Sequence, residues 1–314
     1  MKILITGGCG YVGTVFVNEL LNQKNFNLVV LDNQWFGNHL NSHNNLKIIK
    51  EDIRNLNEEV FREVDIVVHL ANIANDPAVD LNPNLSWEVN VLSAMNLIET
   101  SIKFGVKQFI YASSGSVYGL KKETNVTEDL SLVPISAYNK TKMIAERVLL
   151  SYSDKINLHI IRPATVCGFS PRMRLDVSVN MLTFQALENS KMTVFGGNQI
   201  RPNIHIKDLS RVYMHFISNP NIQSGCYNAG FENLSINSIA KLIKKMIPNT
   251  SIDITESNDN RSYRLNSDKL LNTGFKPLYN IKYAIEEIIE EFNNGNIKNE
   301  DINYTIKWMK KINL

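Results

Sequence analysis

Residues 2–13, KILITGGCGYVG, decide the fold of this chain. A run of aliphatic residues leads directly into glycines at positions 7, 8, 10 and 13, and a helical pattern follows over residues 11–22. Glycines at a strand-to-helix turn permit the tight turn, the close approach of the backbone to a pyrophosphate and the packing of helix on strand. The helix N-terminus then faces the phosphates. The stretch predicts a dinucleotide-binding βαβ unit whose cofactor contacts come from Gly7, Gly10, Tyr11, Val12 and Gly13.

Outward from this stretch, β-branched runs alternate with helical patterns. The runs occupy residues 27–31, 46–50, 65–70, 106–112 and 157–162, and the helical patterns lie near 84–103 and 137–153. This alternation is typical of a parallel sheet with helices on both faces. We therefore predict an α/β fold with a doubly wound parallel sheet of Rossmann type.

The regular alternation weakens after Pro163, where turn signals separate shorter elements. Helical patterns here lie near residues 178–189, 207–218, 235–246 and 278–293. We predict two domains. The first, residues 1–167, binds the dinucleotide, and residues of about 200–230 return to it. The second, residues 168–314, is a smaller and irregular α/β lobe that binds the substrate.

The composition is that of a globular protein without unusual charge. Of 314 residues, 44% are hydrophobic and 20% charged, and 33 Lys and Arg balance 31 Asp and Glu. The chain lacks the charge runs that would predict a nucleic-acid partner, and the apolar stretches of about 20 residues that would predict a membrane span. Cys9, Cys167 and Cys226 are too widely spaced for a disulfide framework or a zinc site, and the six histidines show no metal-ligand spacing. We expect a cytoplasmic protein with no catalytic metal.

Two acidic residues follow the second and third predicted strands. Asp32 and Asn33 end the run LVVLDN about 20 residues after the glycines, where a carboxylate accepts hydrogen bonds from the adenosine ribose and repels a 2′-phosphate. This position predicts NAD rather than NADP. Asp52 ends the third strand in KEDIR, and it fits a helix cap or an adenine contact equally well.

A tyrosine and a lysine lie four residues apart in YNKTK, so Tyr138 and Lys142 share one face of a predicted helix. The ammonium and an oxidised nicotinamide would both favour the phenolate, which lowers the pKa of Tyr138 from about 10. The segment SSGSVYG, residues 113–119, ends an earlier strand, and a serine hydroxyl there can donate to the substrate oxygen that Tyr138 deprotonates. Each feature alone is usually a solvated helix face or a turn, but together with the glycine loop they indicate a catalytic site.

Seven motifs follow one another along the first half of the chain: TGGCGYVG, LDN, DIRN, HLAN, WEVNV, SSGSVYG and YNKTK. In order and spacing they resemble the extended short-chain dehydrogenase/reductases that act on nucleotide sugars. UDP-galactose 4-epimerase is the best-known member of that family. The resemblance implies a tightly held NAD, with Tyr138 as base, Lys142 bridging Tyr138 and the nicotinamide ribose, and Ser114 as the hydroxyl partner. It also implies cofactor contacts from Ile53, Leu70, Ala71 and Asn90. Apolar residues on more than one face of the helices near 84–103 and 137–153 fit the homodimer that similar enzymes form.

The second half carries further marks of the same family. These marks are the segments RPATVCG, GGNQIRPNIHIKD and SYRLNSDKLLNTGFKP. The resemblance implies that the substrate is a nucleotide-diphosphate sugar. It also implies that Asn180, Arg201 and Arg261 hold this substrate and that Ser116 contacts it. Arg172 and Arg174 are further candidates, since guanidinium groups suit a diphosphate. NIANDPAVDLNP and SPRMRLDVSVN resemble the enzymes that oxidise C-4 of GDP-manno-heptose for bacterial surface polysaccharides.

The departures from the family pattern narrow the reaction. Dehydratases place Asp-Glu after the catalytic hydroxyl, where this chain has Gly115 and Ser116, so dehydration is disfavoured and oxidation at C-4 by a 4-dehydrogenase or 4-epimerase is expected. Cys167 replaces the usual tyrosine near the sugar. Two alternatives stay open: an NAD(P)H-dependent reductase of a non-nucleotide small molecule, and a non-catalytic NAD-sensing protein. The first would favour a basic residue after the second strand, and the second could lose Tyr138 or Lys142.

Overall fold

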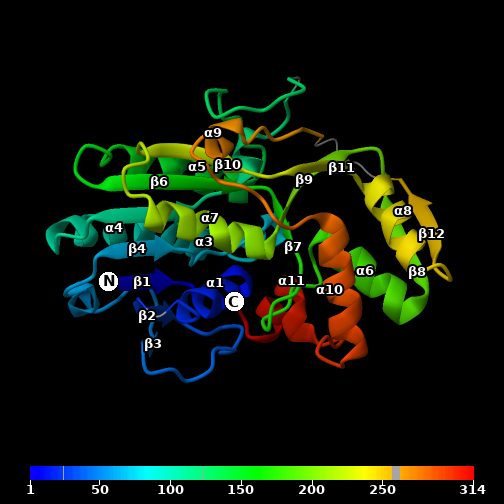
Figure 1. Cartoon of the computed structure of the whole chain (residues 1–314), viewed down its shortest axis with the longest axis horizontal. Helices are drawn as coiled ribbons and strands as arrows, with labels where there is room; N and C mark the ends of the chain where they lie inside the picture. The colour runs from blue at the N-terminus through cyan, green and yellow to red at the C-terminus, as the bar shows by residue number, and fades with distance from the viewer. Residues whose placement is uncertain (24, 122, 257–261) are drawn as a thin grey trace.

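The computed structural model describes residues 1–23, 25–121, 123–256 and 262–314. Its largest element is a seven-stranded sheet in which every neighbouring pair is parallel (Figure 1). In spatial order the strands are β3 (Leu46–Lys50), β2 (Asn27–Asp32), β1 (Lys2–Thr6), β4 (Ile66–His69), β5 (Gln108–Ala112), β6 (Asn157–Pro163) and β10 (Gly225–Ala229). This confirms the predicted doubly wound parallel sheet. The strand order reverses between β1 and β4, which places a ligand crevice at their carboxyl ends.

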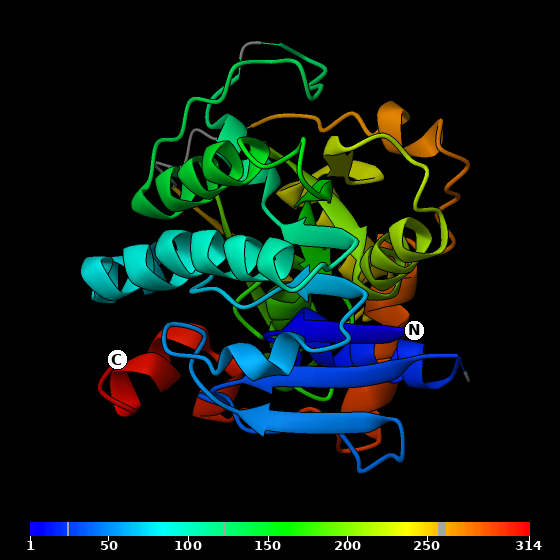
Figure 2. The ribbon, with the colours of Figure 1, turned by 90° about the vertical axis from the view of Figure 1, so that its left-hand side faces the viewer.

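Helices cover both faces of this sheet (Figure 2). On one face, α1 (Tyr11–Leu21) packs beside α7 (Ile206–Ser218) over residues such as Ile3, Ile5 and Val30. On the other face, α4 (Ser93–Lys103) and α5 (Ala137–Leu150) pack over Leu4 and Val67. The central strands are apolar on both sides because both sides are buried.

The single helix expected near residues 84–103 is divided in the structure. α2 (Asp76–Leu81) and α3 (Pro83–Trp87) are followed by a π-helical turn, η2 (Glu88–Leu92), and only then by α4. Asn82 begins α3 by accepting a hydrogen bond from the Leu85 backbone at 3.1 Å, with Pro83 at the first helical position. A 3.6-residue periodicity does not reveal the wider turn, and such turns often occur at functional sites.

The second lobe consists of two small sheets and three helices, which Figure 1 shows at one end of the molecule. Strands β7 (Thr165–Cys167), β9 (Ile200–His205) and β11 (Glu232–Ser235) form one sheet, and β8 (Lys191–Phe195) pairs with β12 (Ser251–Thr255). The helices α6 (Ser178–Asn189), α8 (Ile236–Met246) and α10 (Ile281–Asn293) share an apolar core that includes Leu182, Ile239 and Ile285. α7 and β10, which fall between these elements in sequence, belong to the large sheet and its cover.

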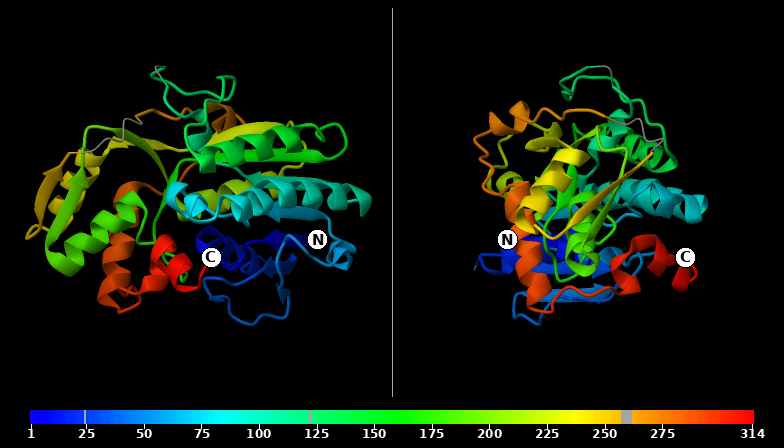
Figure 3. Two further views of the ribbon diagram at one scale, coloured as in Figure 1. Left: turned by 180° about the vertical axis from the view of Figure 1, so that it is seen from behind. Right: turned by 90° about the vertical axis from the view of Figure 1, so that its right-hand side faces the viewer.

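The shorter elements complete the chain. They are η1 (Glu58–Phe61), η3 (Gly115–Tyr118), α9 (Asp268–Leu271), η4 (Asp301–Asn303) and α11 (Thr305–Lys311). α11 follows the second lobe in sequence but packs against α2, beside the large sheet (Figures 2 and 3). In the described part of the chain, no helix combines the length and the apolar character that crossing a membrane requires.

Half of the apolar side chains that suggested a subunit contact belong to the chain's own core. Val91, Leu97, Ile98 and Leu149 are buried under α4 and α5. The sequence required one face of these helices to cover the sheet, and these four residues belong to that face. Leu92 is exposed, with 51% of its surface accessible, so an apolar surface remains on the outer side of this layer. The homodimer stays a prediction.

Candidate active site

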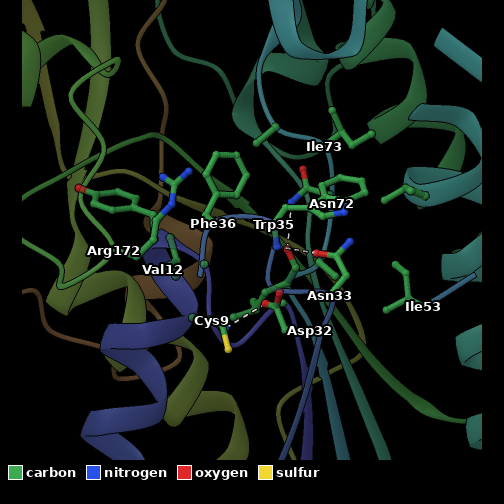
Figure 4. Close-up of a pocket in the computed structure, with 18 of the residues that line it drawn as sticks. Cys9, Val12, Asp32, Asn33, Trp35, Phe36, Ile53, Asn72, Ile73 and Arg172 are labelled. Carbon is green, nitrogen blue, oxygen red and sulfur yellow. Dashed lines mark hydrogen bonds between the residues drawn. The ribbon is translucent and has the colours of Figure 1, made fainter. Parts of the chain in front are cut away.

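A pocket of about 200 Å³ opens at the carboxyl ends of β1, β2 and β4 (Figure 4). Most of the residues predicted to contact the cofactor line it: Gly7, Gly10, Tyr11, Val12, Gly13, Asp32, Asn33, Asp52, Ile53, Leu70 and Ala71. The reversal of strand order thus brings together residues that are up to 64 positions apart, from Gly7 to Ala71.

The glycine loop has no room for side chains. Gly7 has φ +75°, and a Cβ atom there would lie 2.5 Å from the Ala71 backbone nitrogen. A Cβ atom on Gly13 would lie 2.3 Å from the Gly7 carbonyl oxygen. These contacts explain both glycines physically: the loop, the start of α1 and the end of β4 approach one another at backbone distance. The resulting floor of backbone N–H groups at the α1 N-terminus suits a pyrophosphate.

Asp32 is fixed at the end of β2 by two backbone donors. Its carboxylate accepts hydrogen bonds from the Cys9 N–H at 3.0 Å and from the Gln34 N–H at 2.7 Å, as Figure 4 shows in part. Burial raises the pKa of Asp32, although both hydrogen bonds oppose this shift. The lone pairs that the two donors leave free face the pocket and suit the two hydroxyls of a ribose.

Asp52 lies at the pocket wall and closes a turn rather than capping a helix, and its contact with the adenine stays a prediction. It lines the pocket, and it also closes a turn by accepting hydrogen bonds from the Arg54 backbone at 2.9 Å and from the Arg54 guanidinium at 2.9 and 3.0 Å. Burial alone would raise the pKa of Asp52, but these contacts with Arg54 lower it. Its carboxylate is therefore largely occupied within the chain.

Asn90 lies behind the pocket. It is 1% exposed, its amide oxygen accepts from the Ile73 N–H at 2.8 Å, and its amide nitrogen donates to the Ile73 carbonyl and to the Thr141 hydroxyl, both at 3.1 Å. Ile73 itself lines the pocket. In the structure, Asn90 therefore positions the pocket wall and joins it to α5, and a direct contact with the cofactor stays a prediction.

Ser114 and Tyr138 meet at the end of β5. Ser114 begins η3, accepts from the Ser116 N–H at 3.2 Å and shares a hydrogen bond with the Ser116 hydroxyl at 2.8 Å. In the protein alone, burial raises the pKa of Tyr138 to about 12, because it desolvates the phenolate, and a hydrogen bond with Ser114 and the charge of Arg174 offset this only in part. The lowering expected from Lys142 together with an oxidised nicotinamide stays a prediction.

Lys142 is 2% exposed and donates a hydrogen bond to the Ala112 carbonyl at 2.7 Å. Its ammonium lies 4.8 Å from the centroid of the Tyr111 ring. Burial lowers the pKa of Lys142 to about 7, although the charge of Glu146 opposes the shift. A cation that is this poorly solvated favours a neighbouring negative charge.

A buried ion pair lies one helical turn beyond Lys142. Glu146 and Arg162 are joined by hydrogen bonds at 2.7 and 3.0 Å, and the Ser113 hydroxyl donates to the same carboxylate. Arg162 also donates to the Tyr118 hydroxyl at 2.7 Å. The pair ties α5 to β5 and β6 directly beneath the catalytic candidates.

Of the residues predicted to bind the diphosphate, Arg172 and Arg174 line this pocket, and Asn180 and Arg201 do not. Asn180 is fully buried, accepts from the Gly168 N–H at 3.0 Å and donates to the Tyr11 hydroxyl at 3.0 Å, so its amide is used within the chain. Arg201 lies on β9 in the second lobe. Arg261 lies outside the described residues. Their contacts with a substrate stay predictions.

A sequence model of the NAD dependent epimerase/dehydratase family matches residues 3–230, more than half of the chain. The chain belongs to this family. UDP-glucose 4-epimerase of Lactobacillus helveticus is 28% identical over 284 residues, which cover 81% of this chain and 83% of that protein. A structure of UDP-glucuronic acid 4-epimerase from Bacillus cereus in complex with NAD is 26% identical, with a TM-score of 0.82 over 95% of this chain and 100% of that one.

The fold is shared more widely. UDP-N-acetylglucosamine 4-epimerase from Methanobrevibacter ruminantium M1, whose structure contains UDP-N-acetylmuramic acid, superposes with a TM-score of 0.86 over 94% of this chain and 98% of that one, at 23% identity. These findings confirm the resemblance that the sequence motifs indicated. The chain is an enzyme of the NAD-dependent nucleotide-sugar epimerase/dehydratase family, and its cofactor is NAD.

The pocket fits this family's cofactor. The glycine contacts leave a backbone surface for phosphates, Asp32 presents free lone pairs at the ribose position, and the buried Nε of Arg172 has no partner within the chain. Among the described residues, no group of three or more His, Cys, Asp or Glu side chains is arranged to hold a metal ion.

Several residues that line the NAD pocket were not predicted to contact the cofactor. Trp35 and Phe36 follow β2, Arg172 and Arg174 follow β7, and Thr305 and Met309 belong to α11. The motif SPRMR drew attention to the two arginines in the sequence, but it suggested that they contact the substrate and not the cofactor. Nothing in the local sequence of α11 indicates that it reaches a pocket formed by β1 and β2.

Proposed function

We propose that this enzyme oxidises the C-4 hydroxyl of a nucleotide-diphosphate sugar, as a 4-epimerase or 4-dehydrogenase. The observation that carries the proposal is the hydrogen-bonded pair of hydroxyls, Ser114 and Tyr138, at the end of β5 and near the NAD pocket. Lys142 is buried one helical turn beyond Tyr138. UDP-glucose 4-epimerase of Lactobacillus helveticus and UDP-glucuronic acid 4-epimerase of Bacillus cereus both act on UDP-sugars, which supports a nucleotide sugar as the substrate class.

In this mechanism each residue has one task. Ser114 holds the sugar C-4 hydroxyl, and Tyr138 Oη takes its proton as the hydride leaves C-4. Lys142 stabilises the tyrosinate form of Tyr138 that accepts this proton, and would hold the ribose beside it. Bound NAD⁺ supplies the hydride acceptor. Because burial raises the pKa of Tyr138 to about 12 in the protein alone, the proton transfer depends on positive charge brought by Lys142 and the cofactor together.

The same geometry argues against elimination of water. Dehydratases use an acid and a base at the two positions after the catalytic hydroxyl, which here are Gly115 and Ser116. A Cβ atom on Gly115 would lie 3.2 Å from the Pro163 carbonyl oxygen, so a carboxylate side chain could enter only by displacing the backbone. Ser116 is used in the hydrogen bond with Ser114 at 2.8 Å.

The choice of sugar is proposed from the sequence. The segments NIANDPAVDLNP and SPRMRLDVSVN favour a GDP-manno-heptose destined for surface polysaccharide, and the small side chains of Ala71, Ala74 and Cys167 leave room for a longer sugar chain or for a rotating 4-keto sugar. We propose that Arg201, Arg261 and Asn180 face the diphosphate end of this substrate.

The test is to incubate the enzyme with UDP-, GDP-, CDP- and dTDP-sugars in deuterated buffer and to follow the products by NMR. An epimerase gives a C-4 isomer without deuterium at C-4, and a dehydrogenase gives a 4-keto sugar, with deuterium entering beside the ketone. Tyr138→Phe is the control and is expected to lower turnover by about 10²- to 10⁴-fold while it retains NAD. A 4-keto-6-deoxy product, or wild-type turnover in Tyr138→Phe, would refute the proposal.

A further inference from the structure

Arg172 is a buried cation in the wall of the NAD pocket. It is 4% exposed, it lines the pocket, and its Nε atom has no hydrogen-bond partner. Arg172 makes no ion pair with a carboxylate in the described part of the chain, whereas Arg174, two residues later, pairs with Asp176 at 2.8 Å. A buried guanidinium without an anionic partner is costly, so such a group usually marks the place of a bound anion.

The guanidinium is held in place by contacts that leave its donors available. Its centre lies 4.0 Å from the centroid of the Phe36 ring, which orients it by a cation–π contact. One nitrogen makes a long hydrogen bond of 3.5 Å to the Met173 carbonyl. Burial, followed by the like charge of Arg174, lowers the pKa of Arg172 to about 9, so the group is still cationic at neutral pH.

The backbone around Arg172 is fastened to the first turn of α1. The Ser170 hydroxyl donates to the Tyr11 carbonyl at 2.8 Å, and the Tyr11 hydroxyl donates to the Gly168 carbonyl at 2.7 Å. Figure 4 shows Arg172 beside Phe36 and above Val12, at the beginning of α1. The N-terminus of α1 after the glycine loop is the place where a pyrophosphate binds.

We propose that Arg172 binds the 5′-pyrophosphate of the bound dinucleotide and so completes an anion site whose other donors are the backbone N–H groups of the glycine loop. The proposal rests on the NAD pocket of the family and is independent of the sugar reaction proposed above. A planar guanidinium can bind two phosphate oxygens at once, which the stacked orientation on Phe36 prepares. Arg172 would therefore retain the cofactor rather than take part in the chemistry.

Another phosphate could occupy the same donor. Asp32 lies near enough for the two charges to influence one another, so a 2′-phosphate on the adenosine ribose is the competing ligand. Its approach would also bring it to the Asp32 carboxylate, which repels it. The substrate diphosphate is the other competitor. Binding of small fragments separates the three.

The experiment measures binding of ADP, adenosine, 2′,5′-ADP and UDP to the full-length protein freed of nucleotide, by calorimetry. For Arg172→Gln we expect ADP affinity to fall tenfold or more, because a charge-assisted contact is worth more than one decade, while adenosine affinity stays unchanged. The loss of ADP affinity should be smaller for Arg172→Lys than for Arg172→Gln. Arg174→Gln is the matched control and should lose least, because Asp176 already neutralises that charge. The NAD content of the purified protein should fall in the same order.

Four results would overturn the proposal. Unchanged ADP affinity in Arg172→Gln, or an equal loss for adenosine and ADP, would assign Arg172 to packing. A loss for UDP alone would assign it to the substrate, and a loss for 2′,5′-ADP with ADP unaffected would assign it to a 2′-phosphate. If Arg172→Gln does not fold, as judged by circular dichroism, Arg172→Lys decides, since it keeps the charge and the length but loses the two-point contact.

Discussion

At the residue scale, burial acts in opposite directions on the two groups of the proposed catalytic pair. It raises the pKa of Tyr138 to about 12 and lowers the pKa of Lys142 to about 7, because it disfavours whichever form is charged. The sequence predicted that the lysine would lower the tyrosine pKa, but it could not give the solvent exposure of either group. In the protein both groups favour their neutral forms, and substrate and cofactor must supply the charges that change this.

Lys142 should make stability depend on pH. Its pKa is about 7 in the folded protein and about 10.4 in the unfolded chain, so the unfolded chain binds more protons between these values. The free energy of unfolding should therefore rise with pH across this window, by at most about 1.4 kcal/mol per unit. Lys142→Met should lack this rise in urea unfolding at pH 6 to 9. The exposed Lys140→Met should keep it; identical slopes in wild type and Lys142→Met would contradict the expectation.

Asp32 should determine the cofactor. Its carboxylate is held by the Cys9 and Gln34 N–H groups and cannot turn away from a 2′-phosphate, so NADH should bind more tightly than NADPH. Asp32→Asn removes the negative charge and keeps only part of the hydrogen bonding, through its amide oxygen. The difference in affinity between NADH and NADPH should therefore become smaller. Fluorescence titration of both nucleotides measures this. Tighter binding of NADPH to the wild type would show that Asp32 does not face the ribose.

At the element scale, the Glu146–Arg162 pair joins α5 to β6 inside the protein. Both side chains are at least 95% inaccessible. Glu146→Gln leaves Arg162 as an uncompensated buried charge, and we expect a loss of about 3–5 kcal/mol in the free energy of unfolding. Urea unfolding measures this free energy. The control is Glu99→Gln at an exposed position on α4, which should lower the free energy of unfolding by less than about 1 kcal/mol. A loss below about 1 kcal/mol for Glu146→Gln would mean that the pair contributes little.

The elements that the sequence predicted well are those with local signals. The glycine loop, β1, β2 and α5 follow from turn chemistry and periodicity. β2 ends within one residue of the prediction, and α5 begins at the predicted residue and ends three residues early. The π-helical turn around Asn90 was missed because its wider spacing resembles a continuous helix. Trp35 and α11 were missed as pocket walls because only tertiary packing brings them to the glycine loop, whereas Arg172 was noticed in SPRMR but assigned to the substrate diphosphate.

At the scale of the whole molecule, the α3–α5 layer leaves an apolar outer surface. Leu92 is 51% exposed on η2, and Met95, Ile144 and Val148 are half-buried on α4 and α5, which pack against each other. We expect this surface to pair with a second copy across a two-fold axis. Light scattering at micromolar concentration should give a dimer for the wild type and a monomer for Leu92→Glu. Leu120→Glu, equally exposed elsewhere, should stay dimeric. A monomeric wild type would contradict the expectation.

The position of α11 has a consequence for how the protein is made. The Trp308 indole donates to the Trp35 carbonyl at 2.5 Å across 273 residues of chain, and Thr305 and Met309 form part of the pocket wall. A ribosome that adds about 5–20 residues per second therefore emits the glycine loop and β2 on the order of ten to fifty seconds before it emits this wall. Until α11 has been synthesised the pocket lacks this wall, so the nascent chain should bind the coenzyme firmly only after α11 has emerged from the ribosome.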